Sequence, residues 1–390
     1  MMVGMYRLLP HIQAYAWGST TAFTDLLGLP ATGAPQAELW LGAHPALPAD
    51  VVLGDRTIPL DEAIAADPAG WLGAAVITRF GSTLPFLVKV LSAAEPLSIQ
   101  AHPSKAQAEA GFARDNALGL VPDAPNRNYR DANHKPELIC ALTDFEGLCG
   151  FRSESAAVAL FRRFQASLLR EAASAVETQG MGPALGLLLR ASREECNTAI
   201  ADVVGRAFPD LHHVAELAQR YPGDPGVAVA LLLNHVVLAP GEALYLGAGN
   251  LHAYLRGTGV EIMANSDNVL RGGLTSKHVD VDELLRVVHP EPGALPRATS
   301  EAVGKGLTRW PVAVADFLLW RAQPTQSQAS VAVPVGGPAV VLCTEGFVQC
   351  VSEDGAVELG RGEAAVSRSV DALLCSGQGT LFVGSVGLIR

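Results

Sequence analysis

The spacing of hydrophobic positions divides the chain into three regions, and the first reads as β-structure. Over residues 1–150 the apolar residues form short runs separated by Gly and Pro, as in 37–41, 84–91 and 138–142. Runs of this length between turn residues are typical of strands in a sandwich or barrel. We therefore predict short β segments throughout this region.

A helical block follows. Residues 153–176 carry apolar side chains at three- and four-residue intervals, which is the spacing of one face of an α-helix. Ser153 stands where its hydroxyl can cap the first turn. The same spacing continues in three further segments, 183–190, 193–208 and 211–220. These patterns predict an α-helical insert domain over residues 153–231.

Strands return after the insert. Segments 236–238 and 243–246 flank a Pro-Gly turn, and the Pro- and Gly-rich stretch 290–306 reads as a linker. Five further short apolar runs follow near the end of the chain: 339–343, 346–351, 356–359, 364–366 and 381–386. We predict one β-domain built from 1–152 and 232–290, interrupted by the helical insert, and a second β-domain over 305–390.

Composition and charge narrow the function classes. The chain has 390 residues, of which 49% are hydrophobic and 17% charged, with a formal net charge of −11. The 28 Lys and Arg residues form no basic run, so we expect no nucleic-acid partner. The longest apolar run, 227–233, is far shorter than the ~18–20 residues of a membrane span. We therefore expect no membrane partner.

Six cysteines are spread along the chain without a CxxC pair. From this spacing we expect no cysteine metal site, and from the N-terminal residues we expect no secretory signal. Disulfides require an oxidising compartment. We expect reduced thiols in a cytoplasmic protein.

The first candidate site is Ser98-Ile99-Gln100-Ala101-His102. In a strand, alternate side chains share a face, so Ser98, Gln100 and His102 would point into one cavity while Ile99 and Ala101 point away. His is a common zinc ligand, and Gln offers a neutral oxygen. Taken alone, a Gln and a His two residues apart are more often ordinary polar residues on the protein surface.

Two more segments carry potential metal ligands. In Asn133-His134-Lys135-Pro136-Glu137 the glutamate begins an apolar strand and could reach a metal through its carboxylate; the alternative is a solvated turn. In Gly249-Asn250-Leu251-His252, which follows the Pro-Gly turn and its strand, a histidine could enter a barrel; the alternative is a histidine in an ordinary hairpin.

The fourth segment runs from Glu261 to Lys277. It contains Asn265-Ser266-Asp267-Asn268 and then Arg271, and this run of polar residues is unfavourable for a strand. A polar loop that ends in cationic side chains suits a phosphorylated polyol. The alternative is a surface loop with charged ends.

In this order and at these separations, the four segments resemble the type I mannose-6-phosphate isomerase family. The stretches Tyr15-Ala16-Trp17-Gly18-Ser19 and Ala37-Glu38-Leu39-Trp40-Leu41-Gly42-Ala43-His44-Pro45 add to the resemblance, which covers roughly 6–290. Ala101 departs from the pattern, since a larger β-branched residue is expected there. Residues 305–390 match only in their general β character.

The resemblance implies the fold: mainly β, with two cupin-type jelly-roll β-barrels and an α-helical insert. It implies a monomer holding one Zn²⁺ per chain, with a small-molecule sugar phosphate as substrate. The implied metal ligands are Gln100, His102, Glu137 and His252. The second barrel, 305–390, contains no histidine and is not expected to repeat this site.

The resemblance also implies the reaction, the interconversion of mannose 6-phosphate and fructose 6-phosphate through a cis-enediol. Implied catalytic residues are Arg271, Lys135, Asp267, Glu261 and His134; implied substrate contacts are Ser98, Lys277 and Lys89. We expect Arg271 to stabilise the oxyanion and Lys277 with Ser98 to hold the phosphate. The sequence does not say which of Glu261, Asp267, Lys135 or His134 is the base.

Three other interpretations stay open at this point. A non-catalytic sugar-binding protein could keep the fold, but it would be expected to lose a metal ligand or Arg271. A metal-dependent oxygenase would favour a histidine-rich iron site rather than one with Gln. An isomerase of another sugar phosphate, or of free mannose, would share the metal site and differ only at the phosphate contacts.

Overall fold

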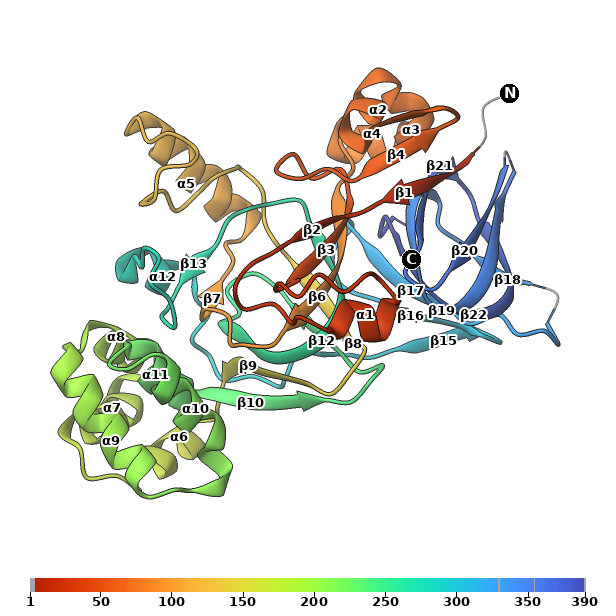
Figure 1. Cartoon of the computed structure of the whole chain (residues 1–390). Coiled ribbons are helices and arrows are strands. Elements are labelled where there is room, and N and C mark those ends of the chain that lie inside the picture. The colour runs from red at the N-terminus through yellow and green to blue at the C-terminus, as the bar shows by residue number, and fades with distance from the viewer. Residues whose placement is uncertain (1–3, 329, 354, 389–390) are drawn as a thin grey trace.

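Two large antiparallel sheets dominate the computed structural model, which describes residues 4–328, 330–353 and 355–388 (Figure 1). Residues 1–3, 329, 354 and 389–390 of the predicted domains lie outside the described residues. No helix in the described part of the chain is both long and apolar enough to cross a bilayer. The structure is thus mainly β, as predicted.

The first sheet joins the two ends of the chain. Its strands are β1 (Met5–Leu9), β4 (Asp50–Leu53), β5 (Arg56–Pro59), β15 (Glu301–Gly304), β16 (Leu307–Trp310), β17 (Leu318–Ala322), β18 (Val331–Val333), β19 (Gly337–Ser352), β20 (Gly355–Gly360), β21 (Ala364–Val370) and β22 (Leu373–Ser385). Its main path is β15-β16-β17-β22-β19-β21-β1-β4-β5, and red β1 lies beside blue β21 in Figure 1. Three strands that we had assigned to the first β-domain therefore extend the sheet of the second, because a strand pattern does not specify its partner.

The second sheet contains the candidate site. Its strands are β2 (His11–Gln13), β3 (Glu38–Gly42), β6 (Phe86–Ala93), β7 (Gln100–Ala101), β8 (Glu137–Ala141), β9 (Phe145–Phe151), β10 (Leu233–Leu238), β11 (Ala243–Leu246), β12 (His252–Ala264), β13 (Leu270–Arg271) and β14 (Arg297–Ala298). Its main path is β14-β11-β8-β12-β6-β3-β2. Segments from both sides of the helical insert thus share one sheet. The predicted linker 290–306 instead contributes β14 and β15, which are too short to leave a pattern in the sequence.

Twelve α-helices and two short 3₁₀ helices are found among the described residues. Helices of the first 150 residues are α1 (Ala22–Leu27), α2 (Leu60–Ala66), α3 (Pro68–Leu72), α4 (Ala74–Phe80) and α5 (Lys105–Ala117). We had predicted only β segments there, and this was wrong. Four of these helices span two turns or fewer, so no helical periodicity develops. The fifth is mostly polar, but its capping box of Ser104 and Gln107 was a readable signal.

The predicted helical insert is present as a separate lobe, green in Figure 1. It comprises α6 (Glu154–Phe161), α7 (Ser167–Gln179), α8 (Met181–Arg190), α9 (Arg193–Gly205), η1 (Pro209–Leu211), α10 (His212–Arg220), α11 (Pro225–Val229) and η2 (Ala230–Leu232). The Ser153 hydroxyl accepts a hydrogen bond from the Ala156 N–H, which confirms the predicted cap. One more helix, α12 (Val281–Val287), follows the candidate phosphate loop.

Alternation along the second sheet decides which side chains reach the site. Phe86, Val88 and Val90 of β6 belong to the core between the two sheets, together with Leu138 of β8 and Ile262 of β12. The intervening residues therefore point to the opposite face, where the site lies. The sheets pack closely, since a Cβ at Gly384 would lie 2.5 Å from Val88 Cγ2.

The helical insert has a core of its own, and the candidate strand reaches into it. Ile99 and Ala101 are fully buried in that core, with Leu148 and Leu251. They point away from the cavity, as predicted. The unexpected alanine at position 101 thus concerns packing of the insert rather than the chemistry of the site.

Candidate functional site

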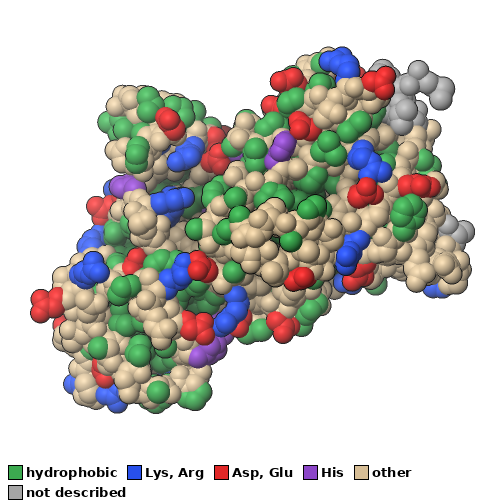
Figure 2. Space-filling view, viewed as in Figure 1, with side chains coloured by type: hydrophobic (Ala, Val, Ile, Leu, Met, Phe, Trp, Pro, Cys, Tyr) green, Lys and Arg blue, Asp and Glu red, His purple; other side chains and the backbone are tan. Residues whose placement is uncertain are grey.

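A cavity of about 410 Å³ lies on the face of the second sheet that is turned away from the inter-sheet core. Its wall includes Arg220 and Tyr221 of the helical insert, so the insert closes one side. Figure 2 shows Lys and Arg side chains gathered in the region between the lobe of α5 and the insert. A larger groove of about 790 Å³ on the insert carries only exposed ionisable groups, namely Glu171, Arg190 and Glu195.

Three predicted ligands converge at the cavity floor. His102, Glu137 and His252 each offer a ligand atom within 4.8 Å of the others. Glu137 Oε2 lies 3.3 Å from His102 Nε2 and 3.5 Å from His252 Nε2. All three side chains are at most 2% exposed.

These groups fit a metal ion. Glu137 Oε2 and His102 Nε2 are buried without an aligned hydrogen bond, an arrangement that is costly unless another partner binds there. Both histidines place Nδ1 against a backbone carbonyl, His102 at 2.8 Å from Asn268 O and His252 at 3.1 Å from Asn250 O. In each ring the Nδ1–H therefore donates a hydrogen bond to the carbonyl oxygen. The unprotonated Nε2 keeps its lone pair available to bind a metal ion.

Charge favours the metal-binding forms of these side chains. Burial lowers the pKa of His102, which keeps the imidazole neutral. Burial by itself would raise the pKa of Glu137, but Lys135 and His102 outweigh it and hold that pKa well below its usual value. The Lys135 amine lies 2.9 Å from Glu137 Oε1, which leaves Oε2 for the ion.

Strand register places Gln100, the fourth predicted ligand, beside the His252 ring. Gln100 of β7 is paired with His252 of β12 on one side and with Arg271 of β13 on the other. The Gln100 amide nitrogen lies 3.4 Å from His252 Nε2. Rotating the amide by 180° puts Oε1 there, so an oxygen ligand is available.

A buried charged row lines the adjacent wall. Lys89 Nζ lies 2.6 Å from Glu261 Oε2 and 3.4 Å from Glu38 Oε1, because β6 runs between β12 and β3. Burial would lower the pKa of Lys89, but Glu261 and Glu38 outweigh it and raise that pKa. Burial raises the pKa of Glu261, and Lys89 opposes it. The Tyr254 hydroxyl donates to Glu261 Oε1 at 2.8 Å.

Cations gather at the other end of the cavity. Arg271 and Lys277 line it, together with Ser98. Burial lowers the pKa of Lys277, as do the charges of Arg271 and Arg130. Among the described residues, neither Arg271 nor Lys277 forms an ion pair with a carboxylate. Their mutual repulsion makes this end of the cavity a favourable place for an anion.

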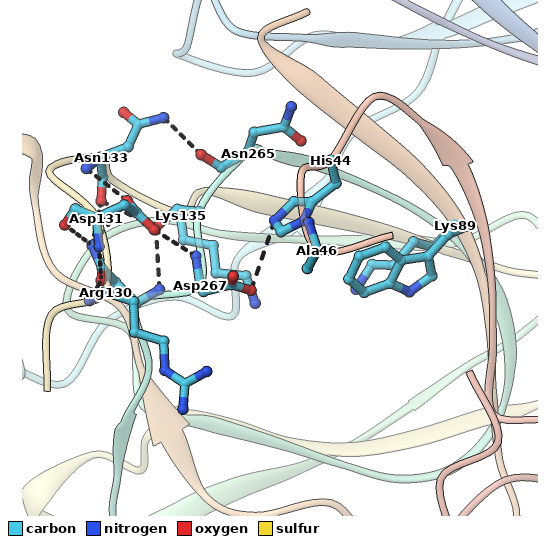
Figure 3. A network of polar contacts seen from close by, with 12 residues as sticks. His44, Ala46, Lys89, Arg130, Asp131, Asn133, Lys135, Asn265 and Asp267 are labelled. Carbon is cyan, nitrogen blue, oxygen red and sulfur yellow. Dashed lines mark hydrogen bonds and ion pairs between the residues drawn. The ribbon is translucent and has the colours of Figure 1, made fainter. Parts of the chain in front are cut away.

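Asp267 lines the cavity on a loop that is tied by hydrogen bonds to Asp131 (Figure 3). The Asp131 carboxylate accepts hydrogen bonds from the Asp267 N–H at 2.8 Å and from the Ser266 hydroxyl at 2.9 Å. Asp267 Oδ1 lies 3.7 Å from His44 Nε2. Since His44 Nδ1 accepts from the Ala46 N–H, the neutral ring carries its proton on Nε2, toward Asp267.

Known proteins of similar sequence match this chain over nearly its whole length. A model of the phosphomannose isomerase type I catalytic domain matches residues 5–154. The mannose-6-phosphate isomerase of Salmonella typhimurium is 38% identical over 390 residues, covering 97% of this chain and 98% of that protein. The chain belongs to the type I phosphomannose isomerase family. The resemblance predicted from the sequence is thereby confirmed.

Other members of the family extend the comparison. The mannose-6-phosphate isomerase of Escherichia coli is 37% identical over 391 residues, with 97% of this chain and 98% of that protein covered. The crystal structure of the S. typhimurium enzyme bound to its substrate f6p and to zinc has a TM-score of 0.91 at 37% identity, covering 99% of this chain and 100% of that chain. A holo, zinc-bound mannose 6-phosphate isomerase has the same TM-score and identity, with the same coverage.

Within this family member, eleven of the twelve predicted site residues lie at the cavity or its metal cluster. They are Ser98, Gln100, Lys89, Lys135, Glu137, Glu261, Asp267, Arg271 and Lys277 in the lining, with His102 and His252 beneath it. His134 is different: its Nε2 lies 3.0 Å from Asp316 Oδ1, and it is not among the lining residues. Asp316 lies 182 residues further along the chain, between β16 and β17. The sequence around His134 therefore gave no sign of this partner.

Four residues near the site were not singled out as candidates. Glu38 and Trp40 alternate along β3 and so face Lys89, while His44 follows the same strand. The alternation of Glu38 and Trp40 was a usable signal. Arg130 lies in a loop without pattern, and only the fold brings it near Arg271.

Proposed function

We propose that the protein is a zinc-dependent isomerase that interconverts mannose 6-phosphate and fructose 6-phosphate. The observation that carries this proposal is the shared cavity of the buried His102, Glu137 and His252 cluster and the cations Arg271 and Lys277. A metal site beside an anion site suits an aldose or ketose phosphate. Membership of the family supports the same substrate pair.

The metal ligands and their chemistry follow from the cluster. His102, His252, Glu137 and Gln100 would hold the zinc ion, which supplies Lewis-acid polarisation of a substrate oxygen when it is bound. Two neutral imidazoles, one carboxylate and one amide form a set that suits Zn²⁺. With a single carboxylate, the loaded site keeps a net positive charge.

The remaining residues bind the two ends of the substrate. Lys277, Ser98 and Arg130 hold the phosphate dianion through charge-assisted hydrogen bonds. Arg271, between the phosphate end and Gln100, stabilises the negative charge that develops on the enediol oxygens. Tyr15 and Trp17, whose rings stack at 5.7 Å, line the mouth and limit the entry of water.

Proton transfer between C2 and C1 needs one group that can reach both carbons. Lys135 and Asp267 both line the cavity and are the candidates that its geometry favours over His134. Lys89 and Glu261 already neutralise each other at 2.6 Å. We therefore assign this pair to holding substrate hydroxyls rather than to carrying the proton.

The finer fold assignment is also a proposal. We propose that each sheet, with its closing strands, forms a cupin-type jelly roll. The second sheet would hold the site, and the first, which includes the strands of 305–390, would support it. The supporting role rests on the buried core between the two sheets, because Leu342 and Phe382 of 305–390 pack in that core. We further propose that the protein acts as a cytoplasmic monomer.

A coupled assay of fructose 6-phosphate formation from mannose 6-phosphate tests the function. The purified protein is assayed as isolated, after chelation, and after stepwise zinc addition, with bound metal measured by mass spectrometry in parallel. We expect activity to disappear with the chelator and to return with zinc. Bound zinc at the cluster without turnover would contradict the proposal and favour another sugar substrate or a binding role.

A further inference from the structure

A second histidine cluster lies outside the catalytic cavity, where the helical insert joins the sheet. His212 and His213 begin α10 of the insert, and His235 lies on β10 of the second sheet. Their ligand atoms all lie within 4.8 Å of one another. Purple histidine surface is visible in Figure 2 at the place where the insert lobe meets the β body.

A carboxylate completes this cluster. Glu146 of β9 places Oε2 at 3.3 Å from His235 Nε2 and at 4.0 Å from His212 Nε2. Since Val237 is the strand partner of Glu146, His235 lies diagonally across from it on the same face. Two imidazole nitrogens thus converge on one carboxylate oxygen.

The hydrogen bonds around the cluster resemble those of the catalytic metal site. His212 Nδ1 lies 3.2 Å from the carbonyl oxygen of Pro209, so its Nδ1–H donates there and Nε2 is free toward Glu146. This is the arrangement found at His102 and His252.

The third histidine is buried without hydrogen bonds. His213 is 1% exposed, and neither of its ring nitrogens has a hydrogen-bond partner among the described residues. Buried polar atoms of this kind are rare, because leaving them unpaired costs about 1–3 kcal/mol. A ligand that binds at this place would satisfy one of them.

We propose that His212, His235 and Glu146, with His213 as a fourth ligand, form a second site for a divalent transition metal such as Zn²⁺. Three imidazoles and one carboxylate are the ligands that zinc prefers. The His213 and His235 rings lie parallel at 4.1 Å, so His213 turns about its Cβ–Cγ bond to present a nitrogen to the ion.

The site's position gives it a structural role. Two ligands come from the insert and two from the sheet, so the ion clamps the insert against the body of the protein. Arg256 competes for both oxygens of Glu146, with Nε 3.1 Å from Oε1 and Nη2 3.2 Å from Oε2. It also pairs with Glu216 at 3.1 Å, which can hold it when an ion binds Oε2. The predicted content of one zinc ion per chain then becomes two.

Metal titration of the whole protein tests this proposal. Chelated protein is titrated with zinc, and bound zinc, isomerase activity and Tm are measured at each step. We expect two equivalents to bind per chain, one that restores activity and one that raises Tm without changing activity. Binding of a single equivalent to the wild-type protein would overturn the second site.

Variants assign the second equivalent to the cluster. His212→Gln and His235→Gln should each bind one equivalent, keep zinc-dependent activity, and lose the Tm rise. His212 is half exposed, so H212Q is expected to fold even if H235Q does not, and its activity reports that fold. The matched control is His11→Gln, a half-exposed histidine 3.1 Å from the Asp50 carboxylate, which should bind two equivalents. Two equivalents in H212Q would show that the extra ion binds elsewhere.

Discussion

The two histidine clusters share their ligand chemistry and differ in what surrounds them. The catalytic one, with Glu137 at its centre, faces a cavity that also holds Lys135 and Arg271. The second, with Glu146 at its centre, lies at a joint between helix and sheet and has Arg256 as its nearest cation. Ligands alone therefore do not make an active site. Catalysis also needs space for a substrate and charges that face the reacting atoms.

The largest loss of activity is expected at Glu137, the carboxylate at the centre of the cluster that faces the cavity. Glu137→Gln removes the only carboxylate from the catalytic cluster, so zinc affinity falls and the transition state loses several kcal/mol of stabilisation. We expect kcat/KM to fall by about 10²–10³-fold or more, as measured in the coupled assay, with bound zinc at this site lost. The control is Glu62→Gln, an exposed carboxylate on α2. Unchanged zinc content and activity in E137Q would contradict the ligand assignment.

A second prediction concerns Arg271, a cation that faces the cavity beside the Glu137 cluster. The second histidine cluster lies instead at the joint between the insert and the sheet. Arg271→Ala should lower kcat by about 10²–10³-fold, because a group that stabilises developing oxyanion charge is lost. Zinc content should stay at the wild-type level, which separates this effect from metal loss. Arg271→Lys keeps a charge and should recover part of kcat. Near-full kcat in R271A would refute the role.

The phosphate end should show a smaller and selective effect. Lys277→Ala should raise KM for mannose 6-phosphate by about 10-fold and leave kcat within a few-fold, since one charged contact to the phosphate is removed from both ground and transition states. Turnover of free mannose, measured in the same preparations, should not change. Equal losses for both sugars would argue against phosphate binding by Lys277.

The smallest effect is expected at the ion pair between Arg220 of the insert and Glu95 of the β body. Both side chains are partly exposed, at 43% and 34%, so solvent screens the pair. Arg220→Ala should lower stability by less than about 1 kcal/mol and Tm by about 2 °C or less, measured by calorimetry. A larger shift would show that this ion pair, rather than the second histidine cluster, fixes the insert.

Local sequence patterns predicted the orientation of several site residues and the position of the helical insert. The period-two order of Ser98, Gln100 and His102 predicted that these residues face the cavity. The structure places all three there, although only Gln100 and Ala101 form a strand. The helical insert was also predicted, since its apolar spacing and Ser153 cap are local signals. The interpretation of the first 150 residues as β alone was wrong, because helices of one or two turns leave no periodicity.

Sequence alone therefore determined the alternation of side chains around Gln100, the helical insert and the family resemblance, and that resemblance implied the metal ligands that we propose. Tertiary structure decided the pairing of β1 with β21, the approach of Glu146 to His235 and His212, and the pairing of His134 with Asp316. The physical reason is the distance along the chain over which each interaction acts. Periodicity and capping act within a few residues, whereas strand partners and ion pairs far apart in the chain are selected by the packing of whole sheets.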